Sequence, residues 1–452
     1  MSIVNSLAVY ILFFAILYKI CKGAESEKFY SLVLGTLLFP LVGTFTSSPA
    51  ISPNHAFIYT YLVVELLISI GKHNSIPKKI IILPLIPLLY STSATILHTD
   101  GFDGKTFYVA LRDFLETYGY FIAAYIAGYK LPKDDIFKKF FTPTIVLCIC
   151  AFIEVLVMYN VPYVIICSAY PNYDMAYTTL ESGGIFIDSW RIRAAVTTVH
   201  PTALGTLLSC LFAFYLPLWG KNVISNKNLL VLHLFILAAI VVCGSRTALI
   251  CAGLTLILFI FFRVNIYLKF IFIGFAFFSL GSIFSLFVDQ FENSRGSNLE
   301  LRKEQMAFSV LSIRRSPIYG NGVQYTSKFI FRDTDDGSRG TAKGYYNENL
   351  GGLESIVFRK IIDFGILGLA SFLFFLLFFQ FYFLFNKKYS VYASSGGLVT
   401  CSFTLFLILS GTLANSIIYG FVFMGYCLAN TYKAKIEAKA ESPKEISCEN
   451  QE

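Results

Sequence analysis

The chain has 452 residues, of which 56% are hydrophobic and only 14% are charged. This composition is typical of polytopic membrane proteins and excludes an ordinary soluble domain. The formal net charge of +8 does not indicate nucleic-acid binding, because much of the excess falls in short linkers between apolar runs, where positive charge marks the cytoplasmic side of a membrane.

Apolar runs of helix length divide the chain from its first residues to its last. A spanning helix needs about 20 apolar residues, with a range of roughly 17–25. By this criterion the predicted spans are 3–20, 30–47, 56–71, 80–97, 114–130, 140–160, 201–219, 229–243, 247–262, 270–288, 361–385, 395–410 and 412–430. The predicted fold class is therefore an all-α polytopic membrane protein with about 13 transmembrane helices (range 12–14).

Lysine and arginine separate between the linkers on the two sides of these spans. One set of linkers is short and rich in lysine, including Lys19, Lys72, Lys130, Lys221 and Lys387. Positive charge in short linkers predicts the cytoplasmic side, which places the N-terminus outside and the C-terminus inside. Apart from Arg263, every arginine falls on the opposite side. Because guanidinium suits bidentate contact with phosphate, we expect an anionic substrate at the outer face.

Two predicted external segments are long and divide the chain into regions. The first, 161–200, belongs to a region of helices that covers 1–288. The second, 289–360, is the longest polar stretch, and a loop of this length is usually functional or disordered; part of it has helical apolar spacing. Spans resume over 361–432, and the Lys-rich tail 433–452 is predicted to be disordered and cytoplasmic.

Two arginines and a histidine converge just before the span that begins at 201. The segment contains Arg191-Ile-Arg193 and then His200-Pro201, and proline suits the first turn of a helix. The free amides and the dipole of a helix N-terminus favour anions. We therefore predict that Arg191, Arg193 and His200 bind the substrate.

A further arginine separates two spans at the outer boundary. Arg246 lies in Gly244-Ser-Arg-Thr-Ala-Leu249. A lone arginine at this position often only extends its head group to the interface. The hydroxyl residues Ser245 and Thr247 favour a functional role instead, so Arg246 is included in the predicted substrate site.

The long loop holds a third group of charged residues around a glycine-rich turn, Pro317-x-x-Gly320-x-Gly322. The predicted roles are catalytic for Arg302 and Glu354 and substrate-binding for Arg314, Arg315 and Glu348. The alternative is that these are solvated charges of an ordinary loop.

Several polar residues interrupt apolar runs. Charged groups inside spans are costly and tend to be functional, but Glu65, Glu116 and Glu154 have the alternative of being hydrogen-bonded structural carboxyls. His233 is expected to be a satisfied interior histidine. The sequence has no nucleotide-binding loop, zinc-protease motif or serine-hydrolase motif, which argues against ATP-driven transport. Its cysteines lack zinc-type spacing, so no cofactor and no metal are expected.

In their order along the chain, these motifs resemble the O-antigen polymerase and ligase superfamily. The similar features are the Arg…His-Pro segment, Ser245-Arg-Thr247, the Pro-x-x-Gly-x-Gly stretch at 317–322 and the Gly-Ile-Leu-Gly-Leu run at 365–369. The resemblance covers about 190–370 by motif and the whole chain by topology. It implies a bacterial inner-membrane glycosyltransferase of the GT-C type that uses polyprenyl-diphosphate-linked glycans and needs no nucleotide sugar and generally no metal.

One departure from the superfamily's pattern favours its polymerase branch. Ligases usually carry a histidine shortly before the glycine-rich run, whereas this chain has Glu354-Ser355 there and no histidine in 289–360. The resemblance then implies transfer of a growing glycan from polyprenyl diphosphate to a lipid-linked repeat unit, with membrane lipid and a chain-length regulator protein as partners and no nucleic acid.

Two alternatives to a polymerase stay open. One is a ligase that transfers glycan to lipid A-core, and the other is a non-enzymatic flippase of lipid-linked oligosaccharide. In the polymerase interpretation, arginines neutralise the departing diphosphate. Glu354 acts as the general base or directly orients the acceptor.

Overall fold

The computed structural model shows an almost entirely helical protein. It describes residues 3–263, 310–326 and 355–449, except for 40–42, 45, 48–49, 73–76, 78, 101–103, 133–134, 171, 174–183, 189–190, 199, 311, 324 and 410–413. Within these residues, nine helices are long and apolar enough to cross a membrane. The chain is therefore a multi-pass all-α membrane protein, as predicted.

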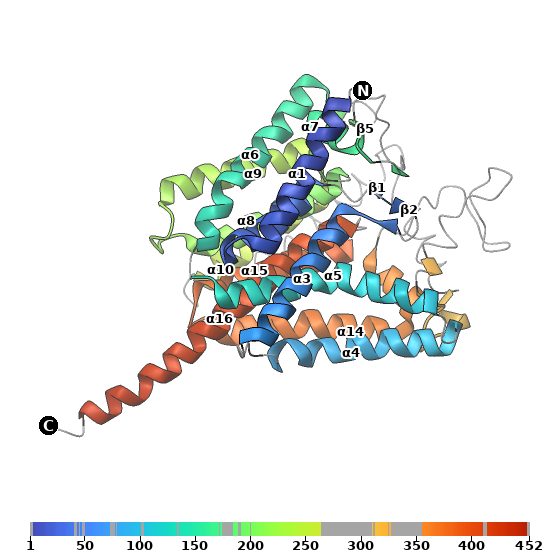
Figure 1. The fold of residues 1–452 in the computed structure, drawn as a ribbon. Coiled ribbons are helices and arrows are strands. Elements are labelled where there is room, and N and C mark those ends of the chain that lie inside the picture. The colour runs from blue at the N-terminus through green and yellow to red at the C-terminus, as the bar shows by residue number, and fades with distance from the viewer. Residues whose placement is uncertain are drawn as a thin grey trace, which may run out of the picture.

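The helices pack as one bundle (Figure 1). They are α1 Ile3–Lys22, α2 Glu25–Leu38, α3 Pro53–Lys72, α4 Lys79–Thr95, α5 Gly104–Lys130, α6 Asp135–Val157, α7 Val161–Cys167, α8 Pro201–Tyr215, α9 Asn226–Cys243, α10 Arg246–Arg263, α14 Ile356–Asn386, α15 Val391–Leu409 and α16 Ala414–Glu449. A π-helical turn, η1 (Ile96–Asp100), continues α4, and a 3₁₀ turn, η2 (Leu216–Leu218), follows α8.

In the described part of the chain, six short strands lie outside these helices and form three antiparallel pairs. The pairs are β1 (Gly43–Thr44) with β4 (Asn172–Tyr173), β2 (Thr46–Ser47) with β3 (Ala50–Ile51), and β5 (Phe186–Asp188) with β6 (Arg191–Arg193). The first pair joins the α2–α3 connection to the segment after α7.

Three predicted boundaries are wrong. The helix predicted at 114–130 begins ten residues earlier, at Gly104. The span predicted at 30–47 ends as a helix at Leu38, because Phe39 precedes Pro40 and takes an extended conformation, as residues before proline tend to do. The tail predicted to be disordered continues α16 to Glu449, a projecting helix in Figure 1, since its alanine, lysine and glutamate residues favour helix. The span predicted at 270–288 lies outside the described residues.

The bundle has two chemically different ends. Helix α5 carries Arg112 in its first half and ends at Lys130, roughly 27 Å further along its axis. Helix α14 likewise carries Arg359 near its start and is followed by Lys387. We call the side where α5 and α14 begin the arginine end, and the side where they finish the lysine end. In these two helices arginine lies near one end and lysine at the other, although Lys360 of α14 also lies at the arginine end.

Helix α5 is central to the bundle and packs closely on α16. A side chain at Gly425 of α16 would place its Cβ 2.3 Å from the Phe121 carbonyl oxygen, and one at Gly128 of α5 would meet the Tyr426 carbonyl at 2.9 Å. Small residues permit such close approach of helices in membranes. The residues of α5 at the arginine end are therefore held on a well-packed element.

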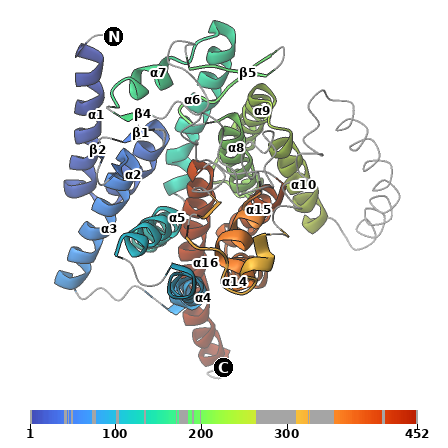
Figure 2. The same cartoon turned by 90° about the vertical axis from the view of Figure 1, so that its right-hand side faces the viewer.

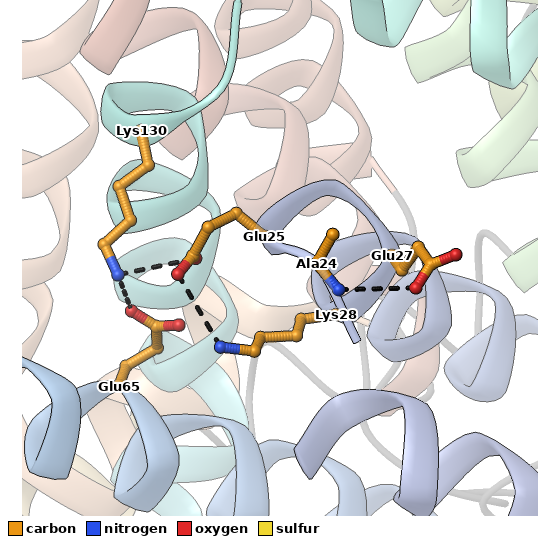
Figure 3. Close-up of polar contacts among 6 residues, drawn as sticks. All are labelled: Ala24, Glu25, Glu27, Lys28, Glu65 and Lys130. Carbon is orange, nitrogen blue, oxygen red and sulfur yellow. Dashed lines mark hydrogen bonds and ion pairs between the residues drawn. The ribbon is translucent and has the colours of Figure 1, made fainter. Parts of the chain in front are cut away.

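The lysine end contains a network of ion pairs that joins α2, α3 and α5 (Figure 3). The Lys130 ammonium binds the buried Glu65 carboxylate and lies 3.4 Å from Glu25. Lys28 in turn lies 3.6 Å from Glu25. Glu65 therefore follows the structural interpretation: it is a carboxyl that is buried with its cation.

Candidate functional site at the arginine end

Helix α14 is broken one third of the way along its length. Gly365 has φ 67° and ψ −166°, a combination that only glycine adopts readily. A break of this kind releases backbone amides and carbonyls from the helix, and in an apolar surrounding these groups must find other partners.

The glycine-rich turn of the long loop supplies those partners. Asn321 N–H donates to the Ile362 carbonyl at 2.9 Å, and Gly322 N–H donates to the Asp363 carbonyl at 3.2 Å. In the other direction, Ile366 N–H donates to the Pro317 carbonyl at 2.9 Å. The two glycine motifs that carry the family resemblance are thus paired through their backbones.

Side chains fasten the same turn to the neighbouring helices. The Asp363 carboxylate accepts hydrogen bonds from both the backbone amide, at 2.8 Å, and the hydroxyl of Thr326. Thr95, at the end of α4, donates to the Tyr319 carbonyl at 2.6 Å, and the His98 ring of η1 lies 4.4 Å from the Tyr319 ring. The turn is therefore held against both α4 and α14.

A cavity of about 220 Å³ lies where this turn meets α4, α5 and α14. Figure 2 shows these three helices end-on and close together. The charged residues that line the cavity are three cations, Arg112, Arg359 and Lys360, and three carboxylates, Asp113, Glu116 and Asp363. Such a concentration of charge beside apolar helices is costly and typical of a functional site.

Two of the cations that line the cavity, Arg112 and Lys360, have different surroundings. Arg112 lies 3.4 Å from the carboxylate of its neighbour Asp113. The Lys360 ammonium lies 4.8 Å from the ring centre of Phe364 and 5.8 Å from that of Phe372, and among the described residues it forms no ion pair within 4 Å. A cation that faces a cavity from an aromatic surrounding suits an anionic ligand.

Arg193 and His200, from the first group of predicted site residues, lie near each other, but each makes a hydrogen bond that stabilises the fold. Arg193 Nε donates to the Cys243 carbonyl at 3.1 Å. His200 caps α8, where its Nδ1 accepts from Thr202 N–H at 3.2 Å. Burial, and then the nearby Arg193, lowers the pKa of His200 to about 4. His200 is therefore neutral near pH 7. The side chain of Arg191 lies outside the described part of the structure.

Arg246 begins α10 beside the start of α8. A Cβ at Gly205 of α8 would lie 2.7 Å from the Ser245 Cβ, so the α9–α10 turn packs directly on α8. The Ser245 hydroxyl accepts from Ala248 N–H at 3.3 Å, which makes Ser245 the cap of α10. The turn that carries Arg246 thus has a defined position.

Glu154 holds the segment that follows Arg193. Its carboxylate accepts from the backbone amides of Ala195 at 3.1 Å and Val196 at 2.7 Å, and from the Asn160 side chain at 3.0 Å. A carboxylate with this many donors is satisfied where it is. Glu154, like Glu65, follows the structural interpretation.

The predicted residues of the long loop are only partly described. Arg314 and Arg315 are exposed, and Arg315 lies 3.4 Å from the Tyr325 hydroxyl. Arg302, Glu348 and Glu354 lie outside the described residues. Glu354 lies two residues before Ile356 in the sequence, and Ile356 lines the cavity.

The sequence-based site left out Arg112, Lys360 and Asp363, which line the cavity. The sequence does contain a signal for Asp363, because this residue lies inside the apolar run predicted at 361–385, where a carboxylate is rare. Arg112 belongs to the arginines of the predicted outer side, but no motif in the sequence marks Arg112 or Lys360 as part of a site. His233, in contrast, is an interior histidine as predicted, with Nδ1 2.7 Å from the Leu229 carbonyl oxygen.

Comparison with known proteins adds no relative to these observations. The sequence matches no protein-family model, and no curated protein is similar enough to count as a relative.

Proposed function

We propose that the protein is a surface-polysaccharide polymerase of the GT-C type, a metal-independent glycosyltransferase. It transfers a growing glycan from polyprenyl diphosphate to a lipid-linked repeat unit at the outer face of a bacterial inner membrane. The observation that carries this proposal is the cavity at the arginine end, where Arg112, Arg359 and Lys360 gather beside three carboxylates.

The chemistry of the proposed reaction needs both kinds of group. When the glycan leaves its lipid carrier, negative charge develops on the departing diphosphate, and preformed cations stabilise that charge. The acceptor hydroxyl must lose its proton, for which a carboxylate is a suitable base. Residues of α4 beside the cavity, such as Leu89 and Tyr90, are exposed, which gives a polyprenyl chain an apolar surface along the bundle.

The proposal retains Glu354 as a residue that orients the acceptor and Arg302 as a second cation for the reaction. It also retains Arg193, Arg246, Arg314 and Arg315 in the path of the glycan. About 13 spans are proposed in total, with the N-terminus outside, so that the arginine end faces away from the cytoplasm.

Cysteine labelling tests this orientation. In a Cys21→Ser background, Gly104→Cys should react with a membrane-impermeant thiol reagent added to intact cells, because Gly104 is exposed and lies at the arginine end. Lys439→Cys, exposed on α16, should react only after the cells are opened. The opposite pattern would reverse the topology and place the cavity on the cytoplasmic side.

A deletion strain tests the reaction itself. We expect loss of long surface chains, with a single repeat unit still attached to the acceptor, as resolved on a glycan gel. Loss of every repeat from the acceptor would indicate a ligase or a flippase. An unchanged ladder would contradict any role in polysaccharide assembly.

A further inference from the structure

His55 is held in one orientation by the start of its own helix. Ser52 N–H donates to His55 Nδ1 at 3.2 Å, and His55 N–H donates back to the Ser52 hydroxyl at 3.3 Å. This reciprocal arrangement is a capping box with histidine in the place of the usual glutamate. Because Nδ1 accepts a hydrogen bond, the proton of a neutral ring resides on Nε2.

His55 Nε2 meets Glu116, one of the carboxylates that line the cavity. The distance between Nε2 and Glu116 Oε2 is 3.1 Å. The His55 side chain is 9% exposed and the Glu116 side chain 19% exposed. The carboxylate therefore touches the cavity on one side and a buried histidine on the other.

The other two carboxylates of the cavity have different surroundings. Asp113 lies 3.4 Å from the guanidinium of Arg112 and so already has a cationic partner. Asp363 accepts two hydrogen bonds from Thr326 and so fastens the glycine-rich turn. Glu116 has neither an arginine nor a lysine within 4 Å among the described residues.

We infer that Glu116 is the catalytic carboxylate that accepts the proton of the acceptor hydroxyl, and that His55 is its positioning residue. The inference rests on the proposed function. In the step, the acceptor oxygen forms a bond to the anomeric carbon, and the bond from that carbon to the diphosphate oxygen breaks with its electron pair. The acceptor proton passes to a Glu116 oxygen and is later lost to water.

This assignment divides the work between two glutamates. Glu116 removes the proton, while Glu354 orients the acceptor. A matched pair of variants, Glu116→Gln and Glu354→Gln, distinguishes the two roles because glutamine keeps the size and hydrogen bonding of the side chain but cannot act as a base.

The experiment uses membranes from the deletion strain that carry its own lipid-linked repeat unit and each variant of the full chain. Chain extension is followed on glycan gels against time and pH. Glu116→Gln should lower the initial rate by about 10²-fold or more. Glu25→Gln, a matched change at the lysine end, should leave the rate unchanged.

His55 variants provide a readout that a merely structural role would not move. His55→Phe removes the polar group that lies 3.1 Å from the Glu116 carboxylate, so the initial rate per folded molecule should fall. His55→Gln places a polar group there again and should recover part of that rate. The other titratable groups around the pair are unchanged in these variants; they include Tyr59, Tyr108, Arg112, Asp113, Tyr118, Tyr120, Arg359, Lys360 and Asp363.

The possible outcomes distinguish the assignment of Glu116 as the base from the proposed function itself. If Glu116→Gln extends chains at the wild-type rate while Arg359→Lys does not, the inference is wrong and the proposed function stands. If Glu354→Gln, and not Glu116→Gln, abolishes extension, Glu354 is the base. If the wild-type protein itself extends no chains in these membranes, both proposals fail. The amount of each variant that elutes as a monodisperse fluorescent fusion separates lost chemistry from lost folding.

Discussion

Replacement of Arg359 by lysine is expected to slow chain extension by roughly one to two decades, although the charge is kept. Arg359 lines the cavity at the start of α14, where a guanidinium can hold two oxygens of a diphosphate at once and an ammonium cannot. A hydrogen bond to a charged group contributes about 1.5–3 kcal/mol, which corresponds to the stated loss if the contact forms in the transition state. The initial rate in membranes measures this effect directly.

Arg263→Lys is the matched control for this prediction. Arg263 lies at the lysine end, where its Nη2 donates to the Trp219 carbonyl at 2.9 Å, and lysine there should leave chain extension unchanged. The same substitution at Arg112 should resemble Arg359→Lys. If all three positions tolerate lysine equally, the cavity does not bind the diphosphate and the proposed function loses the observation that carries it.

Much of the fold follows from local patterns in the sequence. Apolar length alone predicts most of the spans, because each helix in a membrane must satisfy its own backbone. The basic residues of the linkers distinguish the two ends of the bundle, because successive linkers of a polytopic protein lie on alternate sides of the membrane. The errors occurred where local chemistry competes with apolar length, as at Phe39 before Pro40 and in the Ala/Lys/Glu-rich end of α16.

The composition of the cavity was not predictable in the same way. It depends on α4 and α5 lying beside α14, and the residues in contact are more than two hundred positions apart in the chain. A single sequence carries no signal for such a pairing. The sequence analysis instead selects residues that belong to recognisable motifs, such as Arg193 and Arg246, and Lys360 belongs to none of them.

The position of His200 follows from the sequence, but its capping hydrogen bond does not. The residue lies at the N-terminus of α8 as predicted, and its ring caps that helix. Because its pKa is lowered to about 4 from 6.5, the unfolded chain binds this proton at a higher pH than the folded one. The contribution of His200 to stability should therefore fall as the pH decreases from about 6.5 to about 4.

Substitution of either glycine at the break of α14 is expected to disrupt the site more than any change of charge. In Gly365→Ala, the new Cβ would lie 2.4 Å from the Ile318 carbonyl oxygen, and in Gly320→Ala it would lie 2.3 Å from the Asp363 carbonyl oxygen. Both residues also have positive φ, 67° and 78°. The backbone strain and the overpacking together should lower the free energy of unfolding by about 2–6 kcal/mol.

Thermal unfolding of detergent-purified fluorescent fusions measures this loss, and Gly253→Ala is its control. Gly253 lies within α10 with nothing within 4 Å of an added Cβ, so alanine there should be neutral or stabilising by up to about 1 kcal/mol. Because the paired turns hold Asp363, which lines the cavity and accepts a hydrogen bond from Thr326 N–H, variants at Gly320 and Gly365 should lose chain extension together with stability. An alanine variant at Gly320 or Gly365 that unfolds at the wild-type temperature would show that the two glycine motifs do not meet as described.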